Sequence, residues 1–360
     1  MTTLIRKLVF SCALFCCGIL SAQDAVRPLK EAQCIDYVST NLNDSRRIFI
    51  SAPDDFTEHK YPVAYLIGAQ ENDFRASILM NEFVVVGIET KDFKKDFLSE
   101  ESRALYLQFL KEELIPYIEK EYQSTSVRLM AGHSLAAGMV IEALLKDEDL
   151  NTFYIATSPT LQLIDTTGLD QWKSTELKAL YFNIGLNENY PQLEAANHAF
   201  HFKLDSLKPA NLQWKFEVMK DETHETNAYT GFCRGYSFYK SLSSVPDSLL
   251  GQSIDNIVNY ASNLKEKYGL SVAIDETVMM PNILINLGEQ NFDEVKMCIE
   301  YMANEQSDLF ADQIDVVLDV VDAINKSGEK EMALGLYQFI VEKIDDPIAK
   351  IMVHELTREE

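Results

Sequence analysis

The sequence is poor in positive charge. Its 360 residues include 32 lysines and arginines against 56 aspartates and glutamates, which gives a formal net charge of −24. Nucleic-acid binding needs a basic patch, and anionic membrane surfaces attract basic segments. The charge therefore argues against both kinds of partner. It favours solubility but does not identify a substrate.

Cysteine is also scarce beyond the N-terminus. Three of the six cysteines lie within the first 20 residues, which leaves Cys34, Cys233 and Cys298, far apart and odd in number. This spacing fits neither a disulfide framework nor a metal site. Two interpretations stay open: three buried thiols, or one disulfide and one free thiol in an oxidising compartment.

No apolar run has the length of a comfortable membrane span, and we expect no transmembrane segment in the mature chain. The N-terminal run, residues 8–20, follows the basic Arg6 and Lys7 and precedes a small-residue site that ends at Ala22. This order is typical of a secretory signal peptide. We therefore predict a signal peptide over residues 1–22, cleavage after Ala22, and a secreted or periplasmic protein.

A lipoprotein anchor is the alternative for this N-terminus, because Cys16 and Cys17 lie within it. The residues that precede them, Phe15 and Cys16, match poorly the small residue that lipoprotein processing requires.

From residue 45 to residue 242, apolar segments of strand length alternate with helical ones. Apolar strands separated by helices indicate a mostly parallel sheet covered on both faces, which is an α/β fold. We expect strands over residues 45–53, 61–68, 82–89, 126–132, 153–159, 179–185 and 212–220, and helices over residues 103–122, 135–147, 193–207 and 229–242.

The alternation ends near residues 243–251. Two later segments, headed by Gly288 and Gly328, are weakly similar to each other, as in helical-hairpin repeats of the tetratricopeptide kind. We therefore predict two domains, α/β over residues 23–245 and all-α over residues 250–360. Helices are expected over residues 253–269, 276–290, 291–305, 309–329 and 330–344.

Ser134 is the candidate nucleophile. An apolar run precedes Gly132-His133-Ser134-Leu135-Ala136 and a helical pattern follows it. A serine in such a tight strand-to-helix turn exposes its hydroxyl above the sheet, as in the G-x-S-x-G nucleophile elbow. Gly132 meets the need for a small residue, and Ala136 adds only a methyl group. The other interpretation is that Ser134 simply caps the helix.

A nucleophile of this kind needs backbone N–H groups to bind the oxyanion. We expect one donor from Leu135, at the positive end of the helix. The second should come from the end of an earlier strand, where Ala69 or Gln70 follows residues 61–68.

His224 is the candidate base. It follows the last predicted strand and precedes the last helix of the α/β part, where a catalytic histidine is expected. His198 and His201 have helical spacing and are expected on a surface or packing face. His133 flanks the nucleophile.

Glu188 is the candidate acid, because it is the only carboxylate in the loop after residues 179–185. An acid there would orient the imidazole and stabilise the imidazolium. Asp165 is a second candidate, Asp221 and Glu222 are expected to point away, and a dyad without an acid stays open. We expect no cofactor and no metal. Trp172 could contact a ligand or simply pack.

These segments occur in an order that resembles the putative esterase family of α/β-hydrolases over residues 35–242. The family includes siderophore esterases, feruloyl esterases and S-formylglutathione hydrolase, and the chain is most similar to secreted bacterial members, some with tetratricopeptide-like C-terminal helices. The resemblance implies Ser134 as nucleophile and His224 as base. The segments that carry it are YPVAYLIG, FVVVGIET, FLKEELIPYIEKEY, RLMAGHSLAAG, YIATSPTL, LYFNIG, WKFEVMKDETHET and GYSFY.

Three positions depart from the family pattern. Ala136 and Ala137 replace two glycines, Gly68 and Ala69 replace an aspartate and a glycine near the oxyanion site, and Glu225-Thr226 replaces Gly-Ser after the histidine.

The leading hypothesis is a serine ester hydrolase that acts on a small-molecule or acylated-sugar ester. The alternative is a weak or inactive pseudo-hydrolase that binds a ligand, or a protein partner through its C-terminal helices. Acyl transfer to a sugar or lipid is a third hypothesis.

Overall fold

The computed structural model describes residues 32–70, 80, 82–146, 150–268 and 272–358. The predicted signal peptide, the cleavage after Ala22 and the possible anchor cysteines lie outside these residues. Within the described part of the chain, no helix combines the length and apolarity that a membrane crossing requires.

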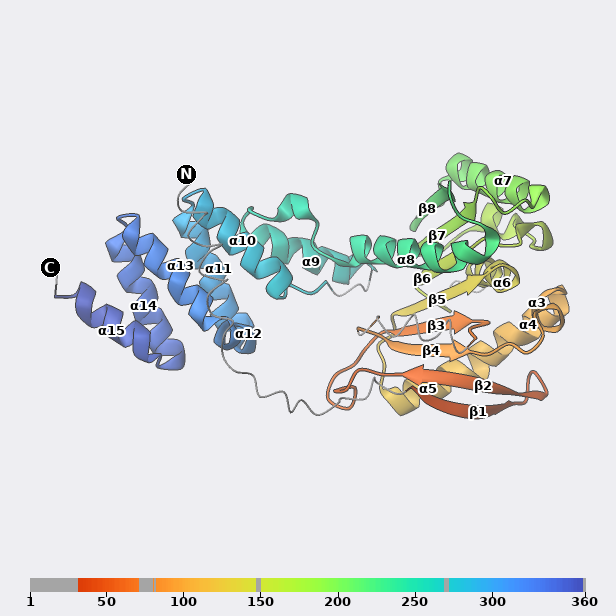
Figure 1. Ribbon diagram of the computed structural model, residues 1–360, viewed down its shortest axis with the longest axis horizontal. Coiled ribbons are helices and arrows are strands. Elements are labelled where there is room, and N and C mark those ends of the chain that lie inside the picture. Colours follow the sequence, from red (N-terminus) through yellow and green to blue (C-terminus); the bar gives the residue numbers. More distant parts are fainter. Residues whose placement is uncertain (1–31, 71–79, 81, 147–149, 269–271, 359–360) are drawn as a thin grey trace.

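The first part of the chain is built on an eight-stranded sheet in the order β1-β2-β4-β3-β5-β6-β7-β8 (Figure 1). The pairs β1–β2 and β2–β4 are antiparallel and the remaining neighbours are parallel, which confirms the predicted α/β class. The strands are β1 Gln33–Ser39, β2 Asp44–Ser51, β3 Val63–Ile67, β4 Val84–Ile88, β5 Arg128–His133, β6 Phe153–Thr157, β7 Lys178–Gly185 and β8 Leu212–Met219.

Strand β1 was missing from the sequence prediction. It lies at the edge of the sheet, pairs only with β2 and is largely exposed, with Val38 78% accessible. An edge strand needs few apolar residues, so the segment lacks the buried pattern that identifies the central strands.

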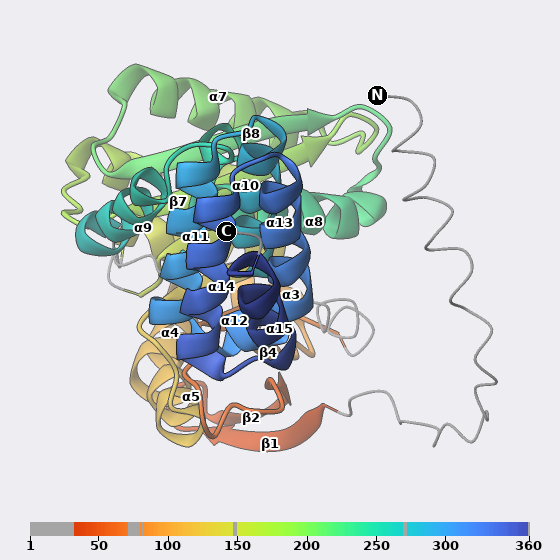
Figure 2. The same ribbon diagram turned by 90° about the vertical axis from the view of Figure 1, so that its left-hand side faces the viewer.

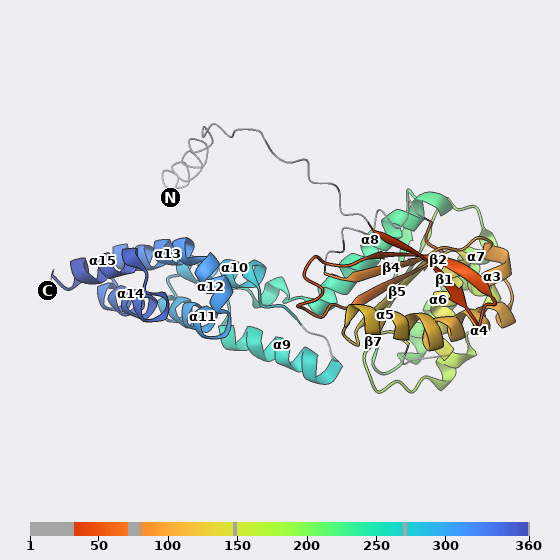
Figure 3. The ribbon, with the colours of Figure 1, turned by 90° about the horizontal axis from the view of Figure 1, so that it is seen from below.

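Helices cover both faces of the sheet, as the all-buried strands β3, β4, β6 and β7 require. Side chains alternate between two cores: Tyr65 and Met130 pack in the larger one with α4 to α7, and Ala64 and Leu129 in the smaller one beneath α8 (Figure 3). The helices are α3 Phe93–Phe97, α4 Glu100–Gln108, α5 Ile115–Tyr122, α6 Leu135–Lys146, α7 Pro191–Leu207 and α8 His224–Ser243, with short helices η2 Leu161–Leu163 and η3 Thr167–Gln171.

The predicted helix over residues 103–122 contains a π-helical segment, η1 Phe109–Leu114, between α4 and α5. Its wider turn places the adjacent Phe109 and Leu110 in the core, together with Leu114.

The second part of the chain is entirely helical in its described residues, as predicted. A separate core begins at Val245, just after α8. The predicted domain limits at residues 245 and 250 stay a prediction. The helices run side by side and extend away from the sheet (Figures 1 and 2). They are η4 Asp247–Leu249, α9 Ile254–Tyr268, α10 Glu276–Gly288, α11 Phe292–Glu305, α12 Ser307–Asp312, α13 Ile314–Lys326, α14 Lys330–Ile344 and α15 Pro347–Leu356.

Each of the two weakly similar segments begins at the turn of a helix pair and continues into its second helix, α11 or α14. Gly288 ends α10 before α11, and Gly328, with φ +101°, lies between α13 and α14. The single helix predicted over residues 309–329 was wrong, because the chain breaks at Gln313 between α12 and α13. Helix α15 was not predicted.

None of the three cysteines in the described residues forms a disulfide. Cys34 and Cys233 are exposed, so the interpretation of three buried thiols holds only for Cys298. Burial in the helical core raises the pKa of the Cys298 thiol to about 12, which makes it unreactive at neutral pH.

Gly235 sets the closeness of α8 to the sheet. A Cβ atom at this position would lie 2.6 Å from Ile155 Cγ2 and 2.9 Å from Tyr181 Cδ1. We expect Gly235→Ala to lower the free energy of unfolding of the α/β part by about 1–3 kcal/mol, because the core must be overpacked. Urea denaturation followed by circular dichroism measures the change.

Gly335→Ala is the matched control, because Gly335 lies in α14 and a Cβ atom at this position would have no neighbour within 4 Å. Alanine is the better helix former, so this variant should be about 0.5–1 kcal/mol more stable. Equal destabilisation by the two changes would contradict the packing argument.

Candidate active site

Ser134 lies in the turn between β5 and α6. Its backbone φ is +56°, and its N–H donates to the carbonyl of Thr157 at 2.9 Å, which fixes the turn against β6. A Cβ atom at position 132 would lie 2.9 Å from the carbonyl carbon and oxygen of Ala136, so only glycine fits there. A non-glycine residue held at positive φ carries strain that the surrounding structure must offset, as in a nucleophile elbow.

The methyl group of Ala136 fits in this turn. It is 1% exposed, and a Cβ atom at Gly68 would lie 3.4 Å from it and 2.8 Å from the Phe93 ring. Gly68, at φ +74°, thus leaves the space that Ala136 and Phe93 fill. Two of the departures from the family pattern, at positions 68 and 136, are complementary in size.

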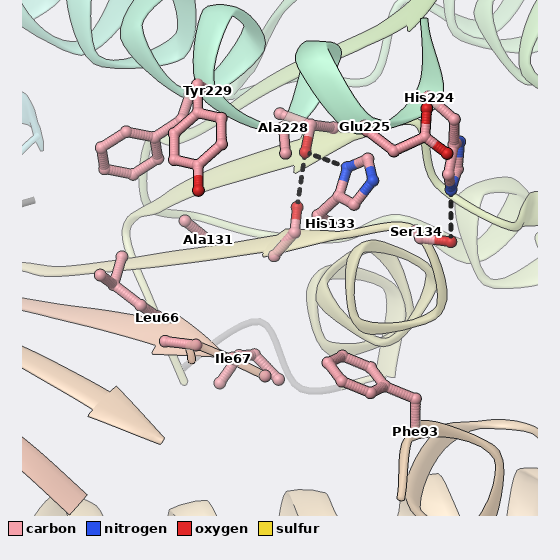
Figure 4. Close-up of a pocket in the computed structure, with 15 residues that line it drawn as sticks. Leu66, Ile67, Phe93, Ala131, His133, Ser134, His224, Glu225, Ala228 and Tyr229 are labelled. Atoms are coloured by element: carbon pink, nitrogen blue, oxygen red, sulfur yellow. Dashed lines mark hydrogen bonds between the residues drawn. The ribbon is translucent and has the colours of Figure 1, made fainter. Parts of the chain in front are cut away.

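His224 is placed by the start of α8. Thr223 is the N-cap, and its side chain and that of Thr226 form a reciprocal capping box. The prediction placed His224 in the loop before the helix; it is instead the first helical residue. Its Nε2 lies 2.9 Å from Ser134 Oγ (Figure 4). Its Nδ1 lies 2.8 Å from Glu188 Oε2.

Glu188 is held ionised in the loop after β7. Burial raises the pKa of its carboxyl group, but hydrogen bonds from His224, the Ser158 hydroxyl and the Gly185 N–H outweigh burial, and the net pKa is lowered. Because an ionised carboxylate only accepts, Nδ1 of His224 must carry the proton toward it. Nε2 is then left as the acceptor of the Ser134 hydroxyl proton, which is the arrangement of a triad.

A buried network of polar side chains behind Glu188 escaped the sequence analysis. Ser158 donates to Glu188 Oε1 at 2.5 Å, Asn227 donates to Ser158 Oγ at 2.6 Å, and Asn183 donates to Asn227 Oδ1 at 2.8 Å. All three side chains are 0% exposed. The signal available in the sequence was a serine that ends a buried strand, in Ser-Pro, with an asparagine three residues after the candidate base.

The predicted oxyanion donors lie on two sides of Ser134. Leu135 is the first residue of α6, and Ala69 follows β3 and lines the same cavity as Ser134. Gln70 does not line that cavity, and its side-chain amide donates to the carbonyl of Thr90 at 3.0 Å. Ala69 is therefore the better placed of the two candidates for the second donor.

His133 lies beside the base. Its Nδ1 is 2.9 Å from Thr157 Oγ1, and its ring centroid is 4.6 Å from that of His224. The ring of Tyr190 approaches His224 edge-on from another side at 5.3 Å. Packing between two rings restricts the orientation of the imidazole.

The remaining candidates lie away from the triad. Asp165 accepts the N–H of Thr167 within its own loop. Trp172 donates to the carbonyl of Ala210 at 2.8 Å and lines neither cavity at Ser134, so it packs rather than faces a ligand. His198 and His201 pack on the ring of Phe216, as expected for a packing face.

Ser134 and His224 open into two cavities. The first, about 500 Å³, lies between β3, β5 and α8 (Figure 4). The second, about 410 Å³, lies toward α7 and is lined by Thr160, Gln162 and Tyr190. No cluster of histidine, cysteine, aspartate or glutamate in the described residues could hold a metal ion.

Comparison with known proteins agrees with the predicted resemblance. Residues 39–181 match the family model described as "Putative esterase". This segment contains β2 to β6 and the Ser134 turn, and it ends before Glu188 and His224. No curated protein matches the chain.

Solved structures share the fold at low sequence identity. An IroE-like serine hydrolase from Shewanella oneidensis has a TM-score of 0.61 at 20% identity, over 74% of this chain and 98% of that one. An uncharacterised protein from Capnocytophaga ochracea has a TM-score of 0.66 at 14% identity, over 91% of this chain and 100% of that one. The siderophore hydrolase EstA from Aspergillus nidulans has a TM-score of 0.51 at 16% identity, over 61% and 99%.

The likeness establishes an α/β-hydrolase fold followed by a helical region. The Capnocytophaga ochracea protein covers nearly the whole chain, so the combination of the two parts is not peculiar to this sequence. The family match, together with the fold, supports a carboxylic ester hydrolase.

The ionisation of Glu188 should appear as a pH-dependent contribution to stability. Its folded pKa lies below the ordinary 4.5, so its contribution is fully present above pH 4.5 and is lost as the pH falls through the folded pKa. We expect Glu188→Gln to be about 1–3 kcal/mol less stable at pH 7, because charged hydrogen bonds are lost. Thermal unfolding from pH 7 down to pH 3 should show this difference shrinking below about pH 4.5.

Glu194→Gln is the control, because Glu194 is an exposed carboxylate on α7. A difference between wild type and Glu188→Gln that stays constant down to pH 3 would contradict an ionised, hydrogen-bonded Glu188.

Proposed function

We propose that this chain, whose residues 39–181 match the putative esterase family, is a serine-dependent carboxylic ester hydrolase. The observation that carries the proposal is the chain of contacts from Ser134 Oγ through His224 to Glu188, with distances of 2.9 Å and 2.8 Å. Ser134 follows β5, Glu188 follows β7 and His224 is the first residue of α8, so the three residues meet from different elements at the carboxyl edge of the sheet. Their convergence is typical of a catalytic site rather than of a capping serine.

In the proposed reaction, Ser134 Oγ attacks the ester carbonyl carbon while His224 Nε2 accepts the hydroxyl proton. The backbone N–H groups of Leu135 and Ala69 stabilise the oxyanion. The carbon–oxygen bond to the alcohol breaks, and the alcohol leaves with the proton held by His224. Water then attacks the carbonyl carbon of the acyl-enzyme while His224 Nε2 accepts one of its protons. The bond between that carbon and Ser134 Oγ breaks, Oγ takes the proton from His224, and the acid is released.

The positive φ of Ser134 and the start of α6 support the oxyanion assignment. Ser134 Oγ contacts His224 in front of α6, whose first N–H groups have no helical partners. Because these groups are fixed before the substrate arrives, little reorganisation is needed in the transition state.

Secretion is part of the proposal. The basic residues, the apolar run and the small-residue site within residues 1–22 support export with cleavage after Ala22. Expression in a bacterial host and mass spectrometry of the mature N-terminus tests it, with Gln23 as the expected first residue.

The role of Ser134 is tested by an alkyl fluorophosphonate probe and by hydrolysis of 4-nitrophenyl esters. Ser134→Ala should abolish labelling and lower kcat at least about 1,000-fold, because the nucleophile is removed. Ser248→Ala is the control, since Ser248 is exposed in the helical region. Unlabelled wild-type protein with a cooperative unfolding transition would overturn the proposal and favour the non-catalytic binding module.

Ser158 should act as a positioning residue for Glu188. We expect Ser158→Ala to lower kcat about tenfold with little change in KM, because one donor to the carboxylate is lost. The pH profile of kcat/KM should move with it, since a less firmly held carboxylate alters the proton affinity of His224. An unchanged profile together with an unchanged kcat would contradict this role.

A further inference from the structure

The two cavities at Ser134 differ in chemistry, and the difference defines a class of substrate. The inference rests on the proposed function, because it takes Ser134 as the point where the ester bond lies. An ester bound there must extend its acyl group into one cavity and its alcohol into the other.

The first cavity is mainly apolar. Leu66 and Ala131 come from the strands, Phe93 lies across from α8, and Tyr229 and Phe232 project from α8. In Figure 4 the strand side chains and those of α8 face each other across the space. A volume of about 500 Å³ is enough for a medium-length aliphatic or an aromatic acyl group.

Glu225 places a negative charge at this cavity. It lines the cavity beside His224, and its carboxylate accepts a hydrogen bond from the Thr223 hydroxyl at 3.1 Å. Its own backbone N–H and then that hydroxyl hold the pKa of Glu225 below its usual value. Among the described lining residues of both cavities there is no lysine or arginine to balance it.

The second cavity is polar, and its described lining residues include no lysine, arginine, aspartate or glutamate. Thr160, Gln162 and Gln192 present hydroxyl and amide groups, and Tyr190 presents a ring that is largely exposed. Hydroxyl and amide side chains of this kind bind neutral hydroxyl groups by donating and accepting hydrogen bonds. Rings such as that of Tyr190 give an apolar surface with a polar edge.

We infer that the substrate is a neutral ester whose apolar acyl group occupies the first cavity and whose hydroxyl-bearing alcohol occupies the second. Glu225 acts as the specificity residue that disfavours anionic acyl groups. A carboxylate on the acyl chain would meet the negative charge of Glu225, an exposed side chain at this cavity, and no lysine or arginine among the described lining residues would offset the repulsion.

The charge selection is tested with two esters of equal acyl length, 4-nitrophenyl hexanoate and mono-4-nitrophenyl adipate. We expect kcat/KM of wild type to be at least about tenfold higher for the hexanoate than for the adipate. Glu225→Gln should reduce this ratio of kcat/KM values about fivefold, mainly because kcat/KM for the adipate rises. Raising the salt concentration should narrow the wild-type ratio as well, because ions screen the repulsion.

Asp221→Asn is the matched control. Asp221 is exposed, lies four residues before Glu225 and lines neither cavity, yet its replacement removes the same net charge. The ratio of kcat/KM for the hexanoate to kcat/KM for the adipate should stay at the wild-type value in this variant. Equal use of the two esters by wild type, or equal narrowing by both variants, would overturn the role of Glu225.

The assignment of the two cavities is tested by filling each in turn. Ala228→Phe should shift the preferred acyl length in a 4-nitrophenyl series from hexanoate and longer toward acetate, because Ala228 lines only the first cavity. Gln192→Phe should leave that series unchanged and lower kcat/KM for hexanoyl-glucose relative to ethyl hexanoate. The opposite pattern, with Gln192→Phe changing acyl length, would reverse the assignment and overturn the inference.

Fluorophosphonate labelling distinguishes failure of the proposed function from failure of the substrate inference. A protein that is not labelled at Ser134 contradicts the proposed function itself. A protein that is labelled, yet uses the adipate as well as the hexanoate, contradicts only the substrate inference.

Discussion

The carboxylate of Glu188 is the point on which the geometry of the site depends. It binds His224 through one oxygen and accepts hydrogen bonds from Ser158 and Gly185 through the other. A buried carboxylate is costly unless its oxygens are paired, and here both oxygens are. The same contacts therefore offset the cost of burying the Glu188 carboxylate and orient the imidazole of His224.

The same carboxylate links elements that are far apart in the sequence. Ser158 follows β6, Glu188 follows β7, and Asn227 and His224 lie in the first turn of α8. Parallel strands bring these loops to one edge, and Gly185 and Gly231 let the chain segments approach closely enough to bond. A Cβ atom at Gly231 would lie 2.5 Å from Asn183 Nδ2, inside this network.

The sequence predicted the fold and the contact between the three candidate triad residues better than it predicted the polar network that holds Glu188. Alternating buried strands and helices identified the sheet because their periodicity depends on burial, and β1 was missed because it is exposed. Ser134, His224 and Glu188 were found because each follows a strand in the order that a triad requires. Ser158 and Asn227 had only a weak signal in the sequence, Asn183 had none, and only the folded chain brings the three side chains together.

The consequence of Ala136 was also not predictable from its own position. Taken alone, an added methyl group suggests a weakened turn. The structure offsets it at Gly68, which directly follows β3 and where a side chain would occupy the space near Ala136 and Phe93. Two substitutions that each depart from the family pattern are better understood as one change in the packing of the turn.

Helix α8 connects the candidate active site, the sheet and the helical region. Its first residue is the proposed base, its middle packs against β6 and β7 through Gly231 and Gly235, and its last turn leads into the helical region. The position of His224 is thus determined by how the whole helix is seated on the sheet. A small tilt of α8, caused at its far end, would displace the imidazole from Ser134 while every residue of the triad stayed intact. The proposed reaction at Ser134 is therefore sensitive to movements of the helical region that shift α8.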